Sequence, residues 1–301
     1  MTAATGEGST SRVAAGIVLV ALAAIGFGFV AFFARTAYAN GLTPQGALVW
    51  RYGLPALLFC WFLPRAVKNR RQGLEAFGVN VLLGCAMIGF FNGFAKLEAA
   101  IVVLIFFMHP LFAIAFAALF ARQWPGAREV AAALMILAAA AIILEPSRIA
   151  GDPWTIAFTF APPVAYGLLI VVLATRLGGM EPLGKIAASY SGIAVVAAAI
   201  AVANGPDILL PTTTTGWLAA IGLVTVSGIG PQLGLMFGAP LLGPGRTAIV
   251  GTLELVVALI AGWTLLGEAV HGREIAGAML VFSAVALTAR PSRRAQRAMP
   301  G

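Results

Sequence analysis

The stretch Val103–Ile142 reads VLIFFMHPLFAIAFAALFARQWPGAREVAAALMILAAAAI, and it has a counterpart 145 residues later at Ala248–Leu287. When the two stretches are superposed, the pair Arg128-Glu129 falls on the pair Arg273-Glu274, and most other positions exchange one apolar residue for another. Self-similarity at a fixed spacing indicates a duplicated structural unit. The sequence therefore predicts two related halves.

The superposition also pairs the two titratable residues that interrupt the apolar runs. His109 in the first stretch falls on Glu254 in the second. Because alanine matches are common by chance in an alanine-rich chain, these charged pairings are the stronger indication of a repeat.

Composition places the chain in a membrane. Of its 301 residues 60% are hydrophobic and 10% charged, with a mean hydropathy of +0.96. Apolar runs of about 20 residues, the length of a membrane-spanning helix, recur throughout. No small-residue cleavage site follows the first run, so we expect a retained helix and not a signal peptide. Cys60 and Cys85 lie inside apolar runs, so we expect buried free thiols, and their spacing is not that of metal ligands.

Ten spans are predicted, and because their apolar runs are continuous we expect helices. They are Val13–Ala34, Pro44–Leu63, Leu74–Phe94, Glu98–Phe120, Ala127–Leu144, Trp154–Ala174, Pro182–Ala203, Gly216–Phe237, Arg246–Leu266 and Gly272–Ala289. The predicted organisation is a segment 1–12, a first five-helix repeat 13–145, a second repeat 153–289 and a basic tail 290–301.

The positive charges predict the orientation. With these spans, 14 of the 19 Lys and Arg residues fall on one side and 4 on the other, while Arg51 lies inside span two. The positive-inside rule then places both termini in the cytoplasm of a cell with the chain in its plasma (inner) membrane. The net charge of +8 is thereby explained by topology, and we expect no nucleic-acid partner.

Five spans per half is an odd number, so the second half enters the membrane from the opposite side. This predicts an all-α protein with two inverted five-helix repeats, a common transporter design. The repeat also superposes Arg51-Tyr52 on Ser189-Tyr190 and the small residues of span three on those of span eight.

At this point the chain resembles the drug/metabolite transporter superfamily, specifically its ten-helix EamA-type members. The resemblance rests on the duplicated unit, on Arg51-Tyr52, on the segment Met108–Leu111, and on Leu253-Glu254 followed by Thr264–Glu268. In this family the span-nine glutamate is typically followed by proline, whereas Leu255 stands here. The resemblance implies export or exchange of small metabolites.

Glu254 and His109 are the first candidates for function, because ionisable groups near the bilayer centre are costly and usually functional. Either residue is able to carry a coupling proton or pair with a charged substrate; the alternative is structural hydrogen bonding. Pro110 should bend span four beside His109, because proline removes a helix hydrogen bond.

Other polar residues are candidates for substrate contact. Arg51 either contacts a substrate carboxylate or snorkels to the outer surface. Tyr52, its repeat partner Tyr190, and Tyr166 either face the cavity or pack. Two neutral residues, Asn92 and Gln232, either line the cavity or bond between helices.

Glycine rows predict close helix packing, because small residues four apart let backbones approach. The rows are Gly89 and Gly93 in span three, and Gly230, Gly234 and Gly238 in span eight.

We find no enzymatic motif, cofactor signature or metal cluster. The sequence predicts a secondary transporter, an exporter of an amino acid-like or drug-like metabolite through a central cavity lined by spans one to four and six to nine. Proton coupling, a uniporter or exchanger without it, and a non-transporting sensor or assembly protein remain alternatives. Spans five and ten should lie at the edge, available for a homodimer contact.

Overall fold

The computed structural model describes residues 4–122, 124–143, 153–177, 179–242, 247, 250–269 and 271–288. Within these residues the fold is entirely helical, without a β-strand. The predicted basic tail at 290–301 and much of the joint between the halves lie outside them. Cys60 and Cys85 are free thiols but are exposed on the helix surfaces, so the expectation that they are buried is wrong.

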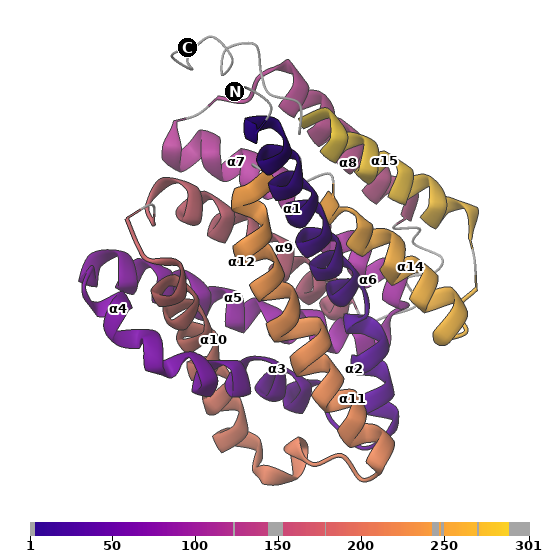
Figure 1. Ribbon diagram of the computed structural model, residues 1–301. Helices are drawn as coiled ribbons and strands as arrows, with labels where there is room; N and C mark the ends of the chain where they lie inside the picture. The colour runs from indigo at the N-terminus through magenta and orange to yellow at the C-terminus, as the bar shows by residue number, and fades with distance from the viewer. Residues whose placement is uncertain are drawn as a thin grey trace.

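Most predicted spans correspond to one or two of these helices (Figure 1). The elements are α1 (Ala4–Gly28), α2 (Val30–Ala39), α3 (Pro44–Phe59), η1 (Cys60–Phe62), α4 (Leu63–Val67), α5 (Arg70–Lys96), α6 (Ala99–Phe106), α7 (His109–Ala121), α8 (Ala127–Ile143), α9 (Pro153–Thr175), α10 (Pro182–Asn204), η2 (Pro206–Leu209), α11 (Thr214–Val224), the π-helical turn η3 (Thr225–Ile229), α12 (Gly230–Leu242), α14 (Leu253–Leu265) and α15 (Gly272–Thr288).

The chain is an integral membrane protein by the character of these helices. Seven helical stretches in the described residues are long and apolar enough to cross a bilayer. Predicted spans five, nine and ten correspond to α8, α14 and α15, which have 17, 13 and 17 described helical residues. Crossing of the membrane by these three shorter helices therefore stays a prediction.

The predicted bend beside His109 is present as a break between α6 and α7. The α6 helix ends at Phe106, and α7 restarts at His109 with Pro110 in its first turn. Proline has no N–H to donate to the carbonyl four residues earlier, which is that of Phe106. Local sequence therefore explains an interruption in the middle of an otherwise apolar span.

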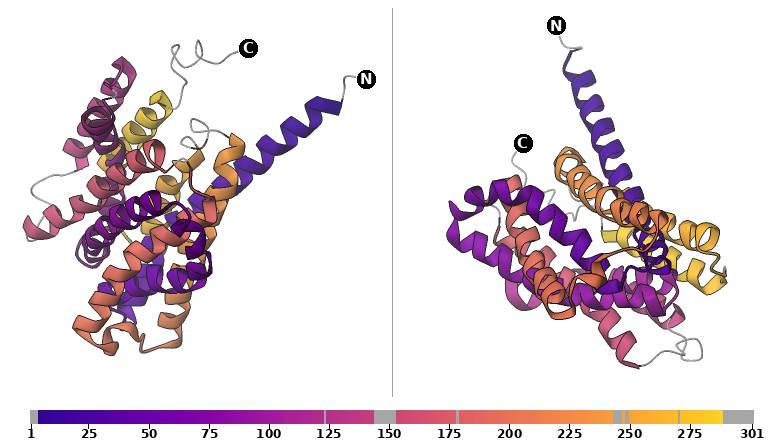
Figure 2. Two further views of the ribbon diagram at one scale, coloured as in Figure 1. Left: turned by 90° about the vertical axis from the view of Figure 1, so that its left-hand side faces the viewer. Right: turned by 90° about the horizontal axis from the view of Figure 1, so that it is seen from below.

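The helices of the two halves pack in corresponding pairs. In the first half α1 packs along α12 and also touches α14; in the second half α9 packs along α5 and also touches α7. The α3 helix packs against its repeat counterpart α10, and α8 packs against its counterpart α15. Figure 1 shows α8 and α15 side by side at the edge of the molecule, and Figure 2 shows the start of α1 projecting beyond the other helices.

Four of the five predicted packing glycines lie at two of these contacts. A Cβ atom at Gly234 would lie 2.8 Å from the Leu19 carbonyl oxygen of α1, and one at Gly238 would lie 2.8 Å from the Leu19 Cβ. At the contact of α5 with α9, a Cβ at Gly89 would collide with the Phe158 carbonyl group. Glycine is therefore required where these backbones approach closely.

The remaining members of the rows differ in their surroundings. A Cβ at Gly93 would lie 3.1 Å from Thr159 Oγ1, so this position also belongs to the α5–α9 contact. Gly230, by contrast, is exposed, and a Cβ there would meet only the Thr225 carbonyl oxygen of its own helical turn, at 3.0 Å. Gly230 thus lies at the π-helical turn and not at a helix–helix contact.

Candidate binding cavity

A cavity of about 580 Å³ lies between the two halves. Its lining residues come from α1, α2, α3, α5, α6, α9, α10, η3, α12 and α14. Each of spans one to four and six to nine therefore contributes, although α7 in span four and α11 in span eight provide no lining residue. The wall is mainly apolar, with Leu83, Met87 and Phe90 on one side and Leu235 and Met236 on another. This volume and apolar character are those of a site for a small organic molecule.

Arg51 lies in this cavity and does not snorkel to the surface. Its residue is 8% exposed, and its guanidinium donates to the Leu223 carbonyl oxygen at 3.3 Å. Leu223 lies two residues before the π-helical turn Thr225–Ile229. The guanidinium also lies 5.8 Å from the centre of the Tyr52 ring. The predicted arginine–tyrosine pair therefore faces the cavity together.

Glu254 also lines the cavity, in the first turn of α14. No hydrogen bond or ion pair joins its carboxylate to another side chain in the described part of the chain. The side chain is half-buried, and Gln232 lines the same cavity. A carboxylate placed in this way is available to bind a proton or a cationic group.

Two predicted site residues, His109 and Asn92, lie behind the wall. His109 Nδ1 donates to the Phe106 carbonyl at 3.0 Å, which is the acceptor that Pro110 leaves without its helical donor. Asn92 donates to the Ile88 carbonyl of its own helix at 2.8 Å. Neither side chain is among those that line the cavity.

His109 nevertheless contacts the site through two lining rings, those of Phe106 and Tyr166. It packs edge-on against Tyr166, with 4.9 Å between ring centres, and Tyr166 lines the cavity. The imidazole is therefore positioned to hold the phenol ring in place. In the described residues no bond links His109 with Glu254, so the pairing between repeat partners that the sequence suggested is not seen.

The predicted tyrosines meet across the cavity. Tyr190 on α10 stacks on Phe59, with ring centres 5.7 Å apart, and lies 6.5 Å from Tyr52 on α3. All three tyrosines line the cavity, as does Gln232. Repeat partners Tyr52 and Tyr190 thus converge because α3 and α10 pack against each other.

Sequence reasoning missed three polar lining residues. These are Lys185 and Ser189 on α10 and Asn80 on α5, which donates to Ser189 Oγ at 3.1 Å. In the sequence Lys185 counted only toward the positive charge of one side. Its four-residue spacing from Ser189 places both on one helix face, a signal that was present.

The cavity extends toward one end of the bundle, which we call the basic end because Arg65, Arg71 and Arg176 lie there. Lining residues include Lys185 in the first turn of α10 and Pro240 in the last turn of α12. None comes from the last turns of α2, α5 or α14. The cavity therefore reaches from the middle of the bundle to the basic end only.

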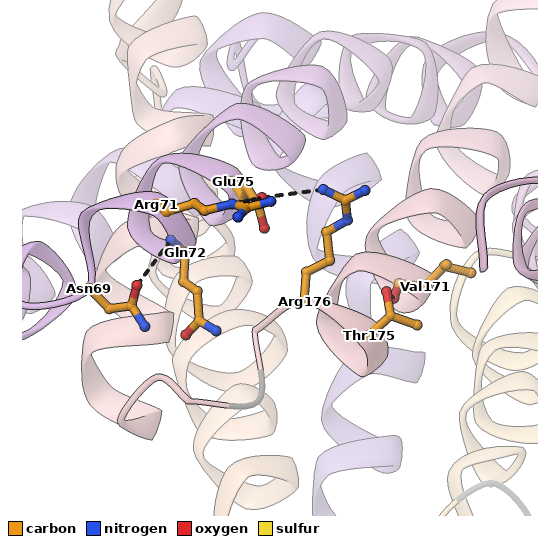
Figure 3. A network of polar contacts seen from close by, with 7 residues as sticks. All are labelled: Asn69, Arg71, Gln72, Glu75, Val171, Thr175 and Arg176. Carbon is orange, nitrogen blue, oxygen red and sulfur yellow. Dashed lines mark hydrogen bonds and ion pairs between the residues drawn. The ribbon is translucent and has the colours of Figure 1, made fainter.

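Ion pairs join helices around the basic end. Figure 3 shows Arg71 and Arg176 converging on Glu75, each with 3.3 Å between nitrogen and Oε1, which links α5 to the end of α9. Arg65 pairs with Glu181 at 2.5 Å and links α4 to α10. These side chains are largely exposed, so the pairs contribute little to stability.

The opposite end is closed by a buried polar cluster, the Arg35–Glu268 cluster. Arg35 on α2 donates to Glu268 Oε1 at 2.5 Å and to the carbonyls of Phe94 and Leu97 at 3.0 and 2.9 Å. Glu268 also accepts from the Ala99 backbone N–H at 2.6 Å. The cluster thus joins α2 and the α5–α6 junction of the first half to the segment after α14 in the second.

A second contact supports this closure. The Trp50 indole donates to the Leu209 carbonyl at 2.8 Å and packs edge-on against Trp217. The Asn40 carbonyl accepts from the Thr212 backbone N–H at 2.9 Å. Residues of both halves are therefore in direct contact at this end.

One group near this end has the residue types of a metal site. Ligand atoms of Glu98, His271 and Glu274 lie within 4.8 Å of one another. His271 Nδ1 lies 3.3 Å from Glu274 Oε1 across the first turn of α15, and the Glu274 backbone N–H donates to the His271 carbonyl oxygen. This arrangement is that of a helix start, and we assign no metal to it.

Comparison with known proteins identifies the family. A model of the EamA-like transporter family matches residues 14–145 and again residues 153–290. A chain of known crystal structure matches 94% of this chain over 98% of its own length, with a TM-score of 0.61 and 17% identity, which supports the fold. No curated protein matches the chain. Because the two family matches cover most of the sequence, the chain belongs to the EamA-like transporter family.

Proposed function

We propose that the protein is a secondary transporter that exports a small metabolite across the plasma membrane through the cavity between its halves. The observation that carries this proposal is the cavity itself. It holds an arginine, a lysine and a glutamate in a mostly apolar wall built by both halves, and it reaches only one end of the bundle. A site accessible from one side at a time is what alternating access requires.

The pairing of helices supports inverted repeats. Under exchange of the two halves, the α1–α12 contact corresponds to the α9–α5 contact, and both use glycines of the predicted rows. The contact of α1 with α14 corresponds in the same way to that of α9 with α7. With both termini in the cytoplasm, the basic end faces inward and the cavity is open to the cytoplasm.

Closure of the outer end then rests on the Arg35–Glu268 cluster. Because Arg35 belongs to the first half and Glu268 to the second, rocking of one half against the other separates them. Release of this cluster opens the cavity outward, and its formation resets the transporter.

Glu254 is the coupling group in this proposal. It lies in the cavity without a paired cation in the described residues, so it is able to exchange a proton with either side as access alternates. His109 has a positioning role, because its contacts are the Phe106 carbonyl and the Tyr166 ring. We expect His109→Ala to weaken transport less completely than Glu254→Gln.

Reconstitution into proteoliposomes tests the proposal. The substrate is first identified by comparing the metabolites that expressing and non-expressing cells release. In proteoliposomes we then expect saturable efflux of this substrate without unitary currents. Binding without any flux would favour a sensor, and large unitary currents would favour a pore. Flux that does not depend on the proton gradient would contradict proton coupling but not transport, and it would indicate a uniporter or exchanger.

A further inference from the structure

Among the described side chains that line the cavity, the basic ones outnumber the acidic ones. Arg51 and Lys185 have positively charged side chains, and Glu254 is the one acidic residue among the described lining residues. Arginine does not release its proton in proteins, so its charge persists at any pH of a cell. The described lining of the cavity therefore has a formal excess of positive charge.

Neither cation forms an ion pair with a carboxylate in the described part of the chain, although Glu254 interacts electrostatically with Arg51. Arg51 donates to a neutral backbone carbonyl, that of Leu223, and no acidic side chain lies within ion-pair distance of it. The guanidinium is buried, and burial of a charge is costly without a partner of opposite charge. Arg51 lines the cavity together with Tyr52 and Tyr190.

Lys185 is kept free by its neighbours. The nearest acidic residue along α10 is Glu181, one turn earlier, and Arg65 binds that carboxylate at 2.5 Å. Lys185 itself forms no ion pair with a described residue. Ser189, one turn further along α10, also lines the cavity, and its hydroxyl oxygen accepts from Asn80 of α5.

The two cations occupy different depths of the cavity. Lys185 lies in the first turn of α10, and Tyr190, which shares the wall with Arg51, lies five residues further along that helix. At about 1.5 Å per residue this is a separation of roughly 7 Å along the helix axis. A ligand entering from the basic end meets Lys185 first and Arg51 next.

Resting on the proposed function, we infer that the cavity binds small amphiphilic organic anions, carboxylates attached to an apolar chain, in preference to organic cations. Lys185 attracts the carboxylate at the mouth, and Arg51 holds it at mid-depth by charge-assisted hydrogen bonds. The apolar chain contacts Leu83, Met87 and Met236. Glu254 excludes a second anionic group unless it is protonated.

The test compares three probes of one shape and different charge: 4-phenylbutyrate, 4-phenylbutanol and 4-phenylbutylamine. Binding to the purified full-length protein is measured by thermal stabilisation in detergent. We expect the carboxylate to bind at least tenfold more tightly than the amine, with the alcohol between. Equal binding, or tighter binding of the amine, would overturn the inference.

Variants assign the preference to the two cations. Arg51→Gln and Lys185→Gln should each weaken carboxylate binding about tenfold or more, since hydrogen bonds to charged groups are the stronger ones. The matched control is Lys68→Gln, an exposed lysine at the same end outside the cavity. If Arg51→Gln does not fold, Lys185→Glu decides, because it should reverse the preference toward the amine.

Failure of this inference and failure of the transport proposal are distinguishable. Carboxylate binding without flux in proteoliposomes would support the proposed ligand class and contradict the proposed transport function. Saturable flux of amines but not of carboxylates would contradict the proposed ligand class and support the proposed transport function.

Discussion

The Arg35–Glu268 cluster makes a prediction about which end of the cavity opens. In the closed arrangement the Glu268 side chain is 6% exposed and that of Arg35 is 27% exposed. Removal of one partner from a buried, hydrogen-bonded pair costs about 3–5 kcal/mol. Once the end is open, water solvates both groups and the same change costs little.

Glu268→Ala should therefore shift the balance toward the outward-open state by about 3 kcal/mol, at the lower limit because Arg35 retains some solvent contact. At about 1.4 kcal/mol per factor of ten, the outward-open fraction rises roughly a hundredfold. The assay places a cysteine at the lining residue Leu235 in a variant without Cys60 and Cys85, and measures its labelling from outside intact cells by a membrane-impermeant maleimide.

The control is the pair Arg65–Glu181 at the basic end. Its nitrogen–oxygen distance is also 2.5 Å, but its side chains are 42% and 49% exposed. Glu181→Ala should leave the outside labelling rate at the parent value. If Glu268→Ala lowers thermal stability and leaves outside labelling unchanged, the cluster stabilises the fold and does not control access.

Three further predictions concern packing, topology and coupling. Gly234→Leu should abolish the folded protein in detergent, because its Cβ would lie 2.8 Å from a carbonyl oxygen of α1; Gly78→Leu, with nothing within 4 Å, should be tolerated, and equal yields of the two would contradict the packing role. A cysteine at the exposed Arg70 should label only from the cytoplasm and one at the exposed Asp207 only from outside, so the reverse pattern would invert the orientation. Glu254→Gln should retain binding but lose transport driven by a proton gradient, measured in proteoliposomes across pH; parent rates throughout would make this residue structural.

Much of the architecture was predictable from the sequence because the bilayer constrains it so strongly. Lipid offers the backbone no hydrogen-bond partner, so long apolar runs must become helices. The ends of the apolar runs therefore predict the approximate ends of the helices. The duplication, the break at Pro110 and the packing role of Gly89 and Gly234 also follow from residue type and spacing. These are local properties, set by one helix or by one pair of matched segments.

The membership of the cavity wall was only partly predictable. Arg51, Glu254 and the three tyrosines line it, whereas His109 and Asn92 bond to their own helices. A polar residue within an apolar run is equally compatible with both outcomes. The rotation of each helix about its axis chooses between them, and that rotation depends on the neighbouring helices.

The sequence by itself determined a helical membrane protein of two related halves, because apolar runs and an internal repeat are both recognised from the order of residues alone. Only the tertiary structure decided that Lys185 belongs to the cavity and that Arg35 meets Glu268, 233 residues away. Such contacts depend on which helix faces lie against each other after all of them have packed. No spacing within one span records that choice, since it is made between segments distant in the chain.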